Sequence, residues 1–157
     1  MKNFRTIALC VTIPLFSLYS SAQTTSIPIN EPNLNKPTMF QSMPDNIPVN
    51  FDNVTSLFSA EVGRTVTVNL SDIVSFRFDG QVVSSVSKYN NTIQSVVVRS
   101  TNLNGANLTI SRITDENGNI SYTGRILSMQ HGDLFELKNI NNQLVMVKRK
   151  FNEVVTE

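Results

Sequence analysis

The feature that most constrains the fold is an alternation of apolar and polar residues, with a period of two, in the part of the chain that follows residue 48. Val66, Val68 and Leu70 alternate with polar residues, and a second alternating run covers residues 74–78. This period places the apolar side chains on one face of a β-strand and the polar ones on the other. From residue 49 onward the chain is therefore expected to form β-sheet with one buried face.

Residues with turn chemistry divide this region into short segments. Further strands are expected at residues 93–100, 107–113, 120–129, 133–138 and 144–150. Turns are expected at Asp79-Gly80, Asn104-Gly105, residues 115–118, His131-Gly132 and residues 139–142. Asp-Gly tolerates the positive φ angles of a two-residue hairpin turn, so the strand that ends at Phe78 should turn back directly into Val82 and Val83. Connections this short make consecutive strands pair antiparallel.

Only two places favour a helix. Phe51, Val54 and Phe58 recur at helical spacing after a possible cap at Asn50 or Asp52, and the last residues, 151–157, could form one turn. The fold class predicted is mostly β: an antiparallel meander of about eight short strands with at most one or two short helices. Such a meander can form a small barrel or a two-sheet sandwich, and the sequence leaves both open.

The N-terminus has the pattern of a secretory signal peptide. Lys2 and Arg5 precede an apolar run over residues 7–19, and small residues follow up to Ala22. The run is shorter than the roughly 20 apolar residues that a transmembrane helix needs. We expect residues 1–22 to be removed by cleavage between Ala22 and Gln23. The short basic start resembles bacterial export signals, so the mature chain is expected in the periplasm or outside the cell.

Removing residues 1–22 also removes chemistry. Cys10 is the single cysteine of the chain, so the mature protein would have no thiol for a disulfide, for catalysis or for a zinc site. Lys2 and Arg5 are two of the 13 basic residues, which leaves eleven against 12 acidic ones. A nearly neutral chain has no long-range field that would attract nucleic acid. We expect no nucleic-acid partner and no transmembrane segment in the mature chain; the oligomeric state stays open.

A compositional boundary lies near residue 48. Five of the six prolines fall between Pro28 and Pro48, whereas all six glycines lie from Gly63 onward. Residues 23–48 are therefore interpreted as an extended tail or linker, and residues 49–157 as one β-rich domain. Residues 38–49 allow a second interpretation, in which their few apolar side chains dock on the domain or on another protein.

Residue types argue against catalysis. The mature chain has one histidine, His131, at an expected turn, whereas zinc catalysis by histidine normally needs two or three. A serine nucleophile would need a base oriented by a third group, and no Gly-x-Ser-x-Gly elbow is present. The carboxylates that could form a catalytic pair are Asp79, Asp115, Glu116, Asp133 and Glu136, and no two of them stand out. We expect no catalytic residue, no metal site and no cofactor, and hence a protein that is not an enzyme.

Apolar residues on the inward face could fill the core or line a ligand cavity. The set expected to face inward is Phe76, Phe78, Val96, Val98, Leu108, Ile110, Tyr122 and Ile126. Phe76, Phe78, Tyr122 and Ile126 are the candidates for contacting a ligand. In a small barrel the interior has just enough room for the barrel's own side chains, so a packed core is favoured over a cavity.

Three short motifs resemble a known group of proteins. The order Phe78-x-Gly80-x-Val82, then Tyr122-x-Gly124-x-Ile126, then residues 134–137 is similar to the β-rich pro-segments of secreted metalloproteases. The resemblance implies an inhibitor or pro-segment-like partner of an exported protease. Two further functions stay open: a non-enzymatic module that binds another exported or cell-surface protein through a sheet edge or loop face, which we favour, and a barrel that holds a small apolar ligand.

Overall fold

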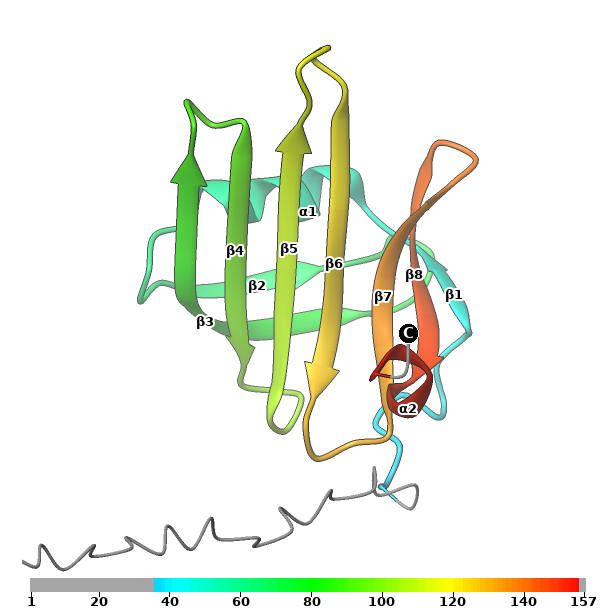
Figure 1. Cartoon of the computed structure of the whole chain (residues 1–157). Coiled ribbons are helices and arrows are strands. Elements are labelled where there is room, and N and C mark those ends of the chain that lie inside the picture. The colour runs from blue at the N-terminus through cyan, green and yellow to red at the C-terminus, as the bar shows by residue number, and fades with distance from the viewer. Residues whose placement is uncertain (1–35, 156–157) are drawn as a thin grey trace, which may run out of the picture. The chain divides into compact units, whose positions relative to one another are not determined.

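The computed structural model describes residues 36–155, which contain one eight-stranded antiparallel sheet (Figure 1). The strands are β1 (Asn46–Pro48), β2 (Thr65–Asn69), β3 (Arg77–Lys88), β4 (Ile93–Ser100), β5 (Ala106–Thr114), β6 (Ile120–Ser128), β7 (Asp133–Ile140) and β8 (Gln143–Lys150). The helical elements are α1 (Phe51–Ser56), the 3-10 turn η1 (Leu57–Ser59) and α2 (Phe151–Val155). The order of the strands in the sheet, β1-β8-β7-β6-β5-β4-β3-β2, is a meander to which β1 is added beside β8.

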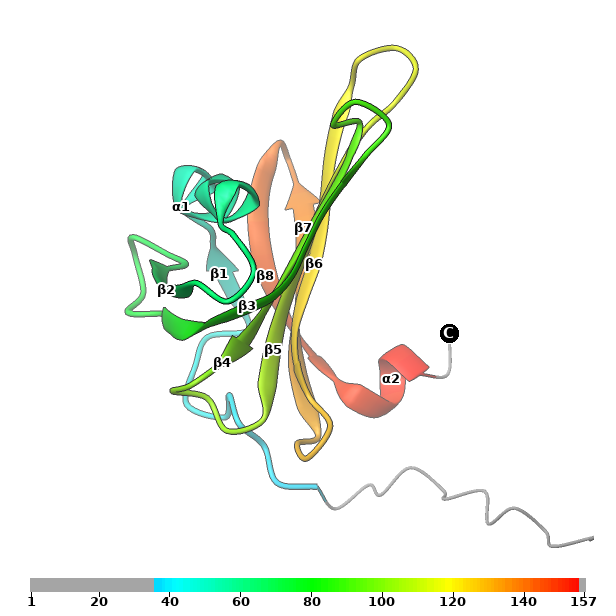
Figure 2. The same ribbon diagram turned by 90° about the vertical axis from the view of Figure 1, so that its left-hand side faces the viewer.

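This architecture confirms the predicted fold class. The strands form one curled sheet, a half-barrel, and its concave face carries the core (Figure 2). α1 and η1 lie over that face and bury Val54 and Leu57 against it. The half-barrel is thus covered by helical turns on its open side, because a sheet with one apolar face needs a second layer to exclude water.

The segment that crosses from β1 to β2 explains how α1 is fixed. The Val49 amide donates to the Leu144 carbonyl at 2.9 Å, and the Asn50 amide donates to the Leu70 carbonyl at 2.9 Å. Asn50 is also the N-cap of α1, since its side-chain oxygen accepts from the Asn53 amide at 2.9 Å. These bonds join the two ends of the sheet through one short connection.

Asp79-Gly80 is not a turn, which corrects the sequence prediction. Both residues lie inside β3, and Gly80 pairs with Ser100 of β4. A Cβ built on Gly80 would lie 2.7 Å from Cγ1 of Val98 and closer still to the Arg99 carbonyl oxygen, so glycine is needed here for close approach between strands. The register shifts between Val82 and Ser84, a bulge that bends β3.

The remaining turns agree better with the sequence. The expected connections near Gly105, Gly118, Gly132 and Asn141 all join consecutive strands. The turn between β3 and β4 was not predicted, and it contains three residues with positive φ: Tyr89, Asn90 and Asn91.

The folded unit begins before the predicted boundary at residue 48. The side chains of Phe40 and Ile47 are fully buried in the core, and β1 pairs with β8. The carboxylate of Asp133 accepts hydrogen bonds from the amides of Met39 at 2.6 Å and of Phe40 at 2.7 Å. Residues 38–48 are therefore part of the domain, as the second interpretation of that segment proposed, because two bulky apolar side chains suffice to anchor it.

A candidate binding site at an opening in the sheet

β6 and β7 pair over only part of their length. Their ladder runs from Gly124↔Leu137 to Leu127↔Leu134 and ends there. β6 nevertheless continues back to Ile120, paired with β5, and β7 continues to Ile140, paired with β8. The two strands therefore separate toward one end of the sheet, and Figure 1 shows the V-shaped gap between them. We call this gap the β6–β7 opening.

The hydrogen-bond alternation of antiparallel strands shows which backbone groups face the opening. At the β5–β6 turn the Asp115 amide donates to the Asn119 carbonyl. The backbone amide and carbonyl groups of odd-numbered residues of β6 therefore point toward β5, and those of even-numbered residues point toward β7. On β6, Ile120 and Tyr122 consequently direct their amide and carbonyl groups into the opening. On β7, Ile140 and Gln143 form the last pair with β8, so the backbone groups of Ile140 point toward β8. By the same alternation, those of Asn139 point into the opening. No ladder pair within residues 36–155 uses these groups.

The inner side of the opening is apolar and aromatic. A cleft there is lined by Val49, Phe51, Ile120, Tyr122, Asn139, Asn142, Gln143 and Leu144. Phe51 and Ile120 are each 48% exposed and lie together in this cleft. The rings of Phe51 and Tyr122 meet edge to face, with centroids 5.3 Å apart and an interplanar angle of 85°. Three amide side chains form the polar rim of this cleft.

Hydrogen bonds of the neighbouring Asn50 fix the backbone at Phe51. It is the first residue of α1 and follows the cap Asn50, whose side-chain amide donates to both carboxylate oxygens of Asp72, at 2.9 and 2.7 Å. Phe58 packs on the other side of Tyr122, with ring centroids 6.4 Å apart. A binding surface that is already fixed loses little conformational entropy when a ligand arrives.

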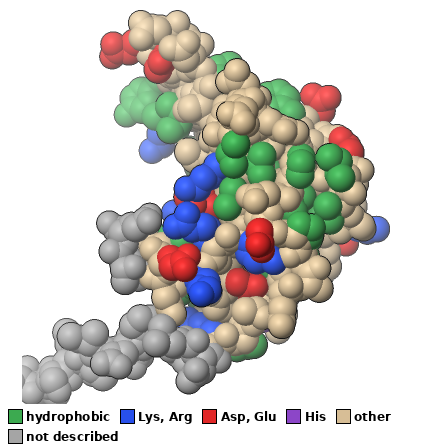
Figure 3. All heavy atoms as spheres, turned by 90° about the vertical axis from the view of Figure 1, so that its right-hand side faces the viewer, with side chains coloured by type: hydrophobic (Ala, Val, Ile, Leu, Met, Phe, Trp, Pro, Cys, Tyr) green, Lys and Arg blue, Asp and Glu red, His purple; other side chains and the backbone are tan. Residues whose placement is uncertain are grey.

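The outer side of the opening is polar. Where β6 and β7 begin to separate, a hollow is lined by Thr109, Ser111, Thr123, Gly124, Arg125, Leu134, Glu136, Leu137 and Val154. Glu136 pairs with Lys138 at 3.1 Å, and no ion pair of the described residues involves Arg125, which is exposed. Figure 3 shows the neighbouring side of the molecule, where Lys, Arg, Asp and Glu side chains lie interspersed.

The four residues predicted to face the core or a ligand do not stay together. Phe76, Phe78 and Ile126 are buried in the core. Phe76 packs against Phe135 with centroids 5.3 Å apart, and Phe40 packs against Phe135 at 4.8 Å. Tyr122 alone is half-buried and reaches a surface cleft. The interior positions thus pack against one another, and the ligand-accessible position is at the opening.

Most of the residues considered for catalysis make structural contacts, whereas Glu116 is an exposed residue of the β5–β6 turn. Nδ1 of His131 lies 2.9 Å from Oγ of Ser128, but Ser128 is only 1% exposed. Both oxygens of Asp133 accept the amides of residues 39 and 40. Asp115 caps the β5–β6 turn, where hydrogen bonds from the side chain and backbone of Asn119 lower the pKa of its carboxyl group. Within residues 36–155 no cluster of three metal-ligating side chains is found.

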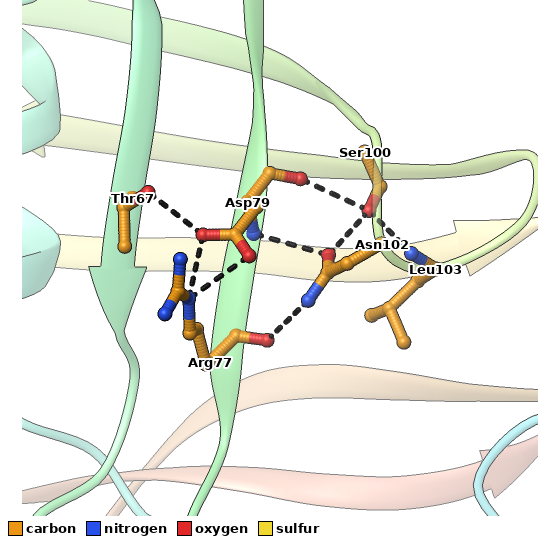
Figure 4. Close-up of polar contacts among 6 residues, drawn as sticks. All are labelled: Thr67, Arg77, Asp79, Ser100, Asn102 and Leu103. Carbon is orange, nitrogen blue, oxygen red and sulfur yellow. Dashed lines mark hydrogen bonds and ion pairs between the residues drawn. The ribbon is translucent and has the colours of Figure 1, made fainter.

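Asp79 belongs to a polar network at the corner of β2, β3 and β4 (Figure 4). Its carboxylate accepts from Nε of Arg77 at 2.8 Å and from the Thr67 hydroxyl at 2.7 Å, and these bonds lower the pKa of Asp79. The side chain of Asn102 accepts from the Asp79 amide at 3.0 Å and donates to the Arg77 carbonyl at 2.9 Å. Beyond the end of β4, the Asn102 side chain thereby provides the donor and the acceptor that the backbone of a neighbouring strand would provide.

Sequence reasoning missed most of the opening. Phe51 was assigned to a helix and Ile120 to a strand, but neither assignment reveals exposure. The run of asparagines at residues 139–142 was interpreted only as a turn. Ala22, Gln23 and Cys10 lie outside the described residues.

Comparison with protein-family models, curated proteins and solved structures finds no match to this chain. Among the described residues no helix is both long and apolar enough to cross a membrane.

Proposed function

We propose that this protein is an exported, non-enzymatic interaction module that binds an extended segment of another protein at the β6–β7 opening. The observation that carries the proposal is that two strand segments face each other across the opening without pairing with one another, Ile120–Thr123 on β6 and 138–140 on β7. Exposed strand edges accept an additional strand, with main-chain hydrogen bonds supplying affinity and alternate side chains supplying specificity.

The geometry of the opening supports this mode over a flat contact. Ile120 and Tyr122 supply two donor and acceptor pairs on one strand, spaced as an incoming strand requires. An inserted segment would alternate its side chains between the inner cleft and the outer hollow. The inner cleft is preformed by Phe51 and Tyr122, and it lies on the same side of the sheet as the core.

The test compares two substitutions at one residue. Ile120→Pro removes the amide that faces the opening, whereas Ile120→Ala shortens the side chain and keeps that amide. The probe is a displayed library of linear peptides about ten residues long, enough to form one strand. Enriched peptides should lose at least about tenfold in affinity with Ile120→Pro and less than about threefold with Ile120→Ala. Equal effects of the two substitutions, with both variants folded, would contradict the proposal.

A second variant closes the opening reversibly. Thr123 and Lys138 are the next opposed positions beyond the last β6–β7 pair, so Thr123→Cys with Lys138→Cys, in a Cys10→Ser background, places a disulfide across the gap. Peptide binding should disappear on oxidation and return on reduction. Binding that survives oxidation would place the peptide elsewhere and overturn the proposal, as would failure of the library to enrich any peptide on the reduced protein.

A further inference from the structure

The two sides of the β6–β7 opening differ in chemistry, and this difference points to the sequence of the segment that binds there. The inference rests on the proposed function, because it assumes that a strand enters the opening. We infer that the opening selects an extended segment in which apolar side chains, facing inward, alternate with acidic side chains, facing outward.

The inner position favours a bulky apolar side chain. Phe51, Ile120 and Leu144 surround it, and the first two are each 48% exposed. Covering these carbons would remove apolar area from water, with a driving force of roughly 25 cal/mol per Å². A basic side chain at this position would lose hydration and find no carboxylate, because no charged residue lines the cleft and the residue paired with Tyr122 on β5 is Arg112.

The outer position favours an acidic side chain. Arg125, Glu136 and Lys138 are the charged groups on the outer face there, and Glu136 already pairs with Lys138. Arg125 lines the hollow where the strands separate; it lies opposite Glu136 in the β6–β7 ladder but forms no ion pair within residues 36–155. The local balance is therefore positive, and an acidic side chain would complement it.

One position on the molecule provides a matched control. Arg99 is an exposed arginine on the same outer face, from β4, and β5 lies between β4 and β6. The hollow that Arg99 lines, with Val83 and Val97, is also lined by Arg125 but by no residue of β7, so it is not part of the β6–β7 opening.

The experiment measures the affinity of one enriched peptide and of two altered forms by fluorescence anisotropy. Replacing its inward apolar residue by Lys should weaken binding at least tenfold, and replacing its outward acidic residue by Lys should weaken binding about threefold to tenfold. Phe51→Ala should remove most of the preference for an apolar inward residue. Arg125→Gln should remove the preference for an acidic outward residue and reduce the dependence of affinity on salt, whereas Arg99→Gln should change affinity less than about twofold.

The outcomes separate this inference from the proposed function. If peptides bind and Ile120→Pro weakens them, but Phe51→Ala and Arg125→Gln leave both preferences intact, the inference is wrong and the proposed function stands. If neutral cello- or chito-oligosaccharides bind the opening, and Tyr122→Phe abolishes that binding while no peptide binds, both are overturned. Unfolding curves for Phe51→Ala and the more conservative Phe51→Leu would show whether a loss of binding reflects a loss of fold.

Discussion

Two places where strands separate in this sheet are treated in opposite ways. At the corner of β2, β3 and β4, the backbone of β3 extends past the end of β4, and the side chain of Asn102 satisfies the Asp79 amide and the Arg77 carbonyl. At the β6–β7 opening, Ile120 and Tyr122 have no such substitute among the described residues. This chain therefore supplies side-chain hydrogen-bond partners for a separated strand at the corner, and it does not do so at the opening.

The largest effect is expected from the strand contact behind the corner. A Cβ on Gly80 would lie 2.7 Å from Cγ1 of Val98, so Gly80→Ala must displace backbone and should reduce the free energy of unfolding by about 3 kcal/mol. Urea denaturation measures this loss. Val86→Ala, at an exposed position of the same strand, should change stability by no more than about 0.5 kcal/mol. A tolerated Gly80→Ala would mean that the corner is as loose as the opening.

Removal of the Asn102 side chain should reduce the free energy of unfolding by less than Gly80→Ala does. Asn102→Ala leaves the Asp79 amide and the Arg77 carbonyl without their partners, which should cost about 1–2 kcal/mol by urea denaturation. Asn104→Ala is the matched control, since it removes an exposed asparagine side chain two residues away. If both variants lose the same stability, the amide of Asn102 has no special role.

Hydrogen exchange should show the contrast residue by residue. In the free protein the Tyr122 amide should exchange at least about tenfold faster than the Asp79 amide, which corresponds to about 1.4 kcal/mol. Neither amide bonds to the backbone of a neighbouring strand, but only the Asp79 amide has a side-chain acceptor. Asn102→Ala should bring the two rates together. Slow exchange at Tyr122 in the unliganded protein would show that the opening is closed in solution.

The smallest expected effect is the change in the free energy of unfolding at acidic pH. The hydrogen bond from Arg77 lowers the pKa of Asp79, so ionised Asp79 stabilises the folded state above its unfolded pKa of about 3.9 and loses that contribution as pH falls through the folded pKa. The stability difference between the wild type and Asp79→Asn should thus be present at pH 6 and shrink below about pH 4. Arg77→Gln, which removes the largest cause, should show the same shrinkage. A difference that stays constant with pH would contradict this role.

The sequence predicted the strands well, because alternation and turn residues are local properties. It predicted Gly80 wrongly, since a glycine needed for close approach between strands and one needed for positive φ look the same in a single sequence. The opening could not be predicted, because the separation of β6 from β7 depends on how far two neighbouring strands stay in contact, and residues 120–129 read as one uninterrupted strand. Phe40 and Ile47 were underestimated for a similar reason: their partners are distant in the sequence.

The anchoring of residues 39 and 40 by Asp133 has a mechanical consequence. Asp133 begins β7, and the opening lies at the other end of the same strand, about 17–23 Å away at roughly 3.3 Å per residue. A pull on the chain before Lys36 and a pull on a strand held in the opening would act at opposite ends of β7. The load would run along the strands and shear many hydrogen bonds at once, rather than unzip them one at a time.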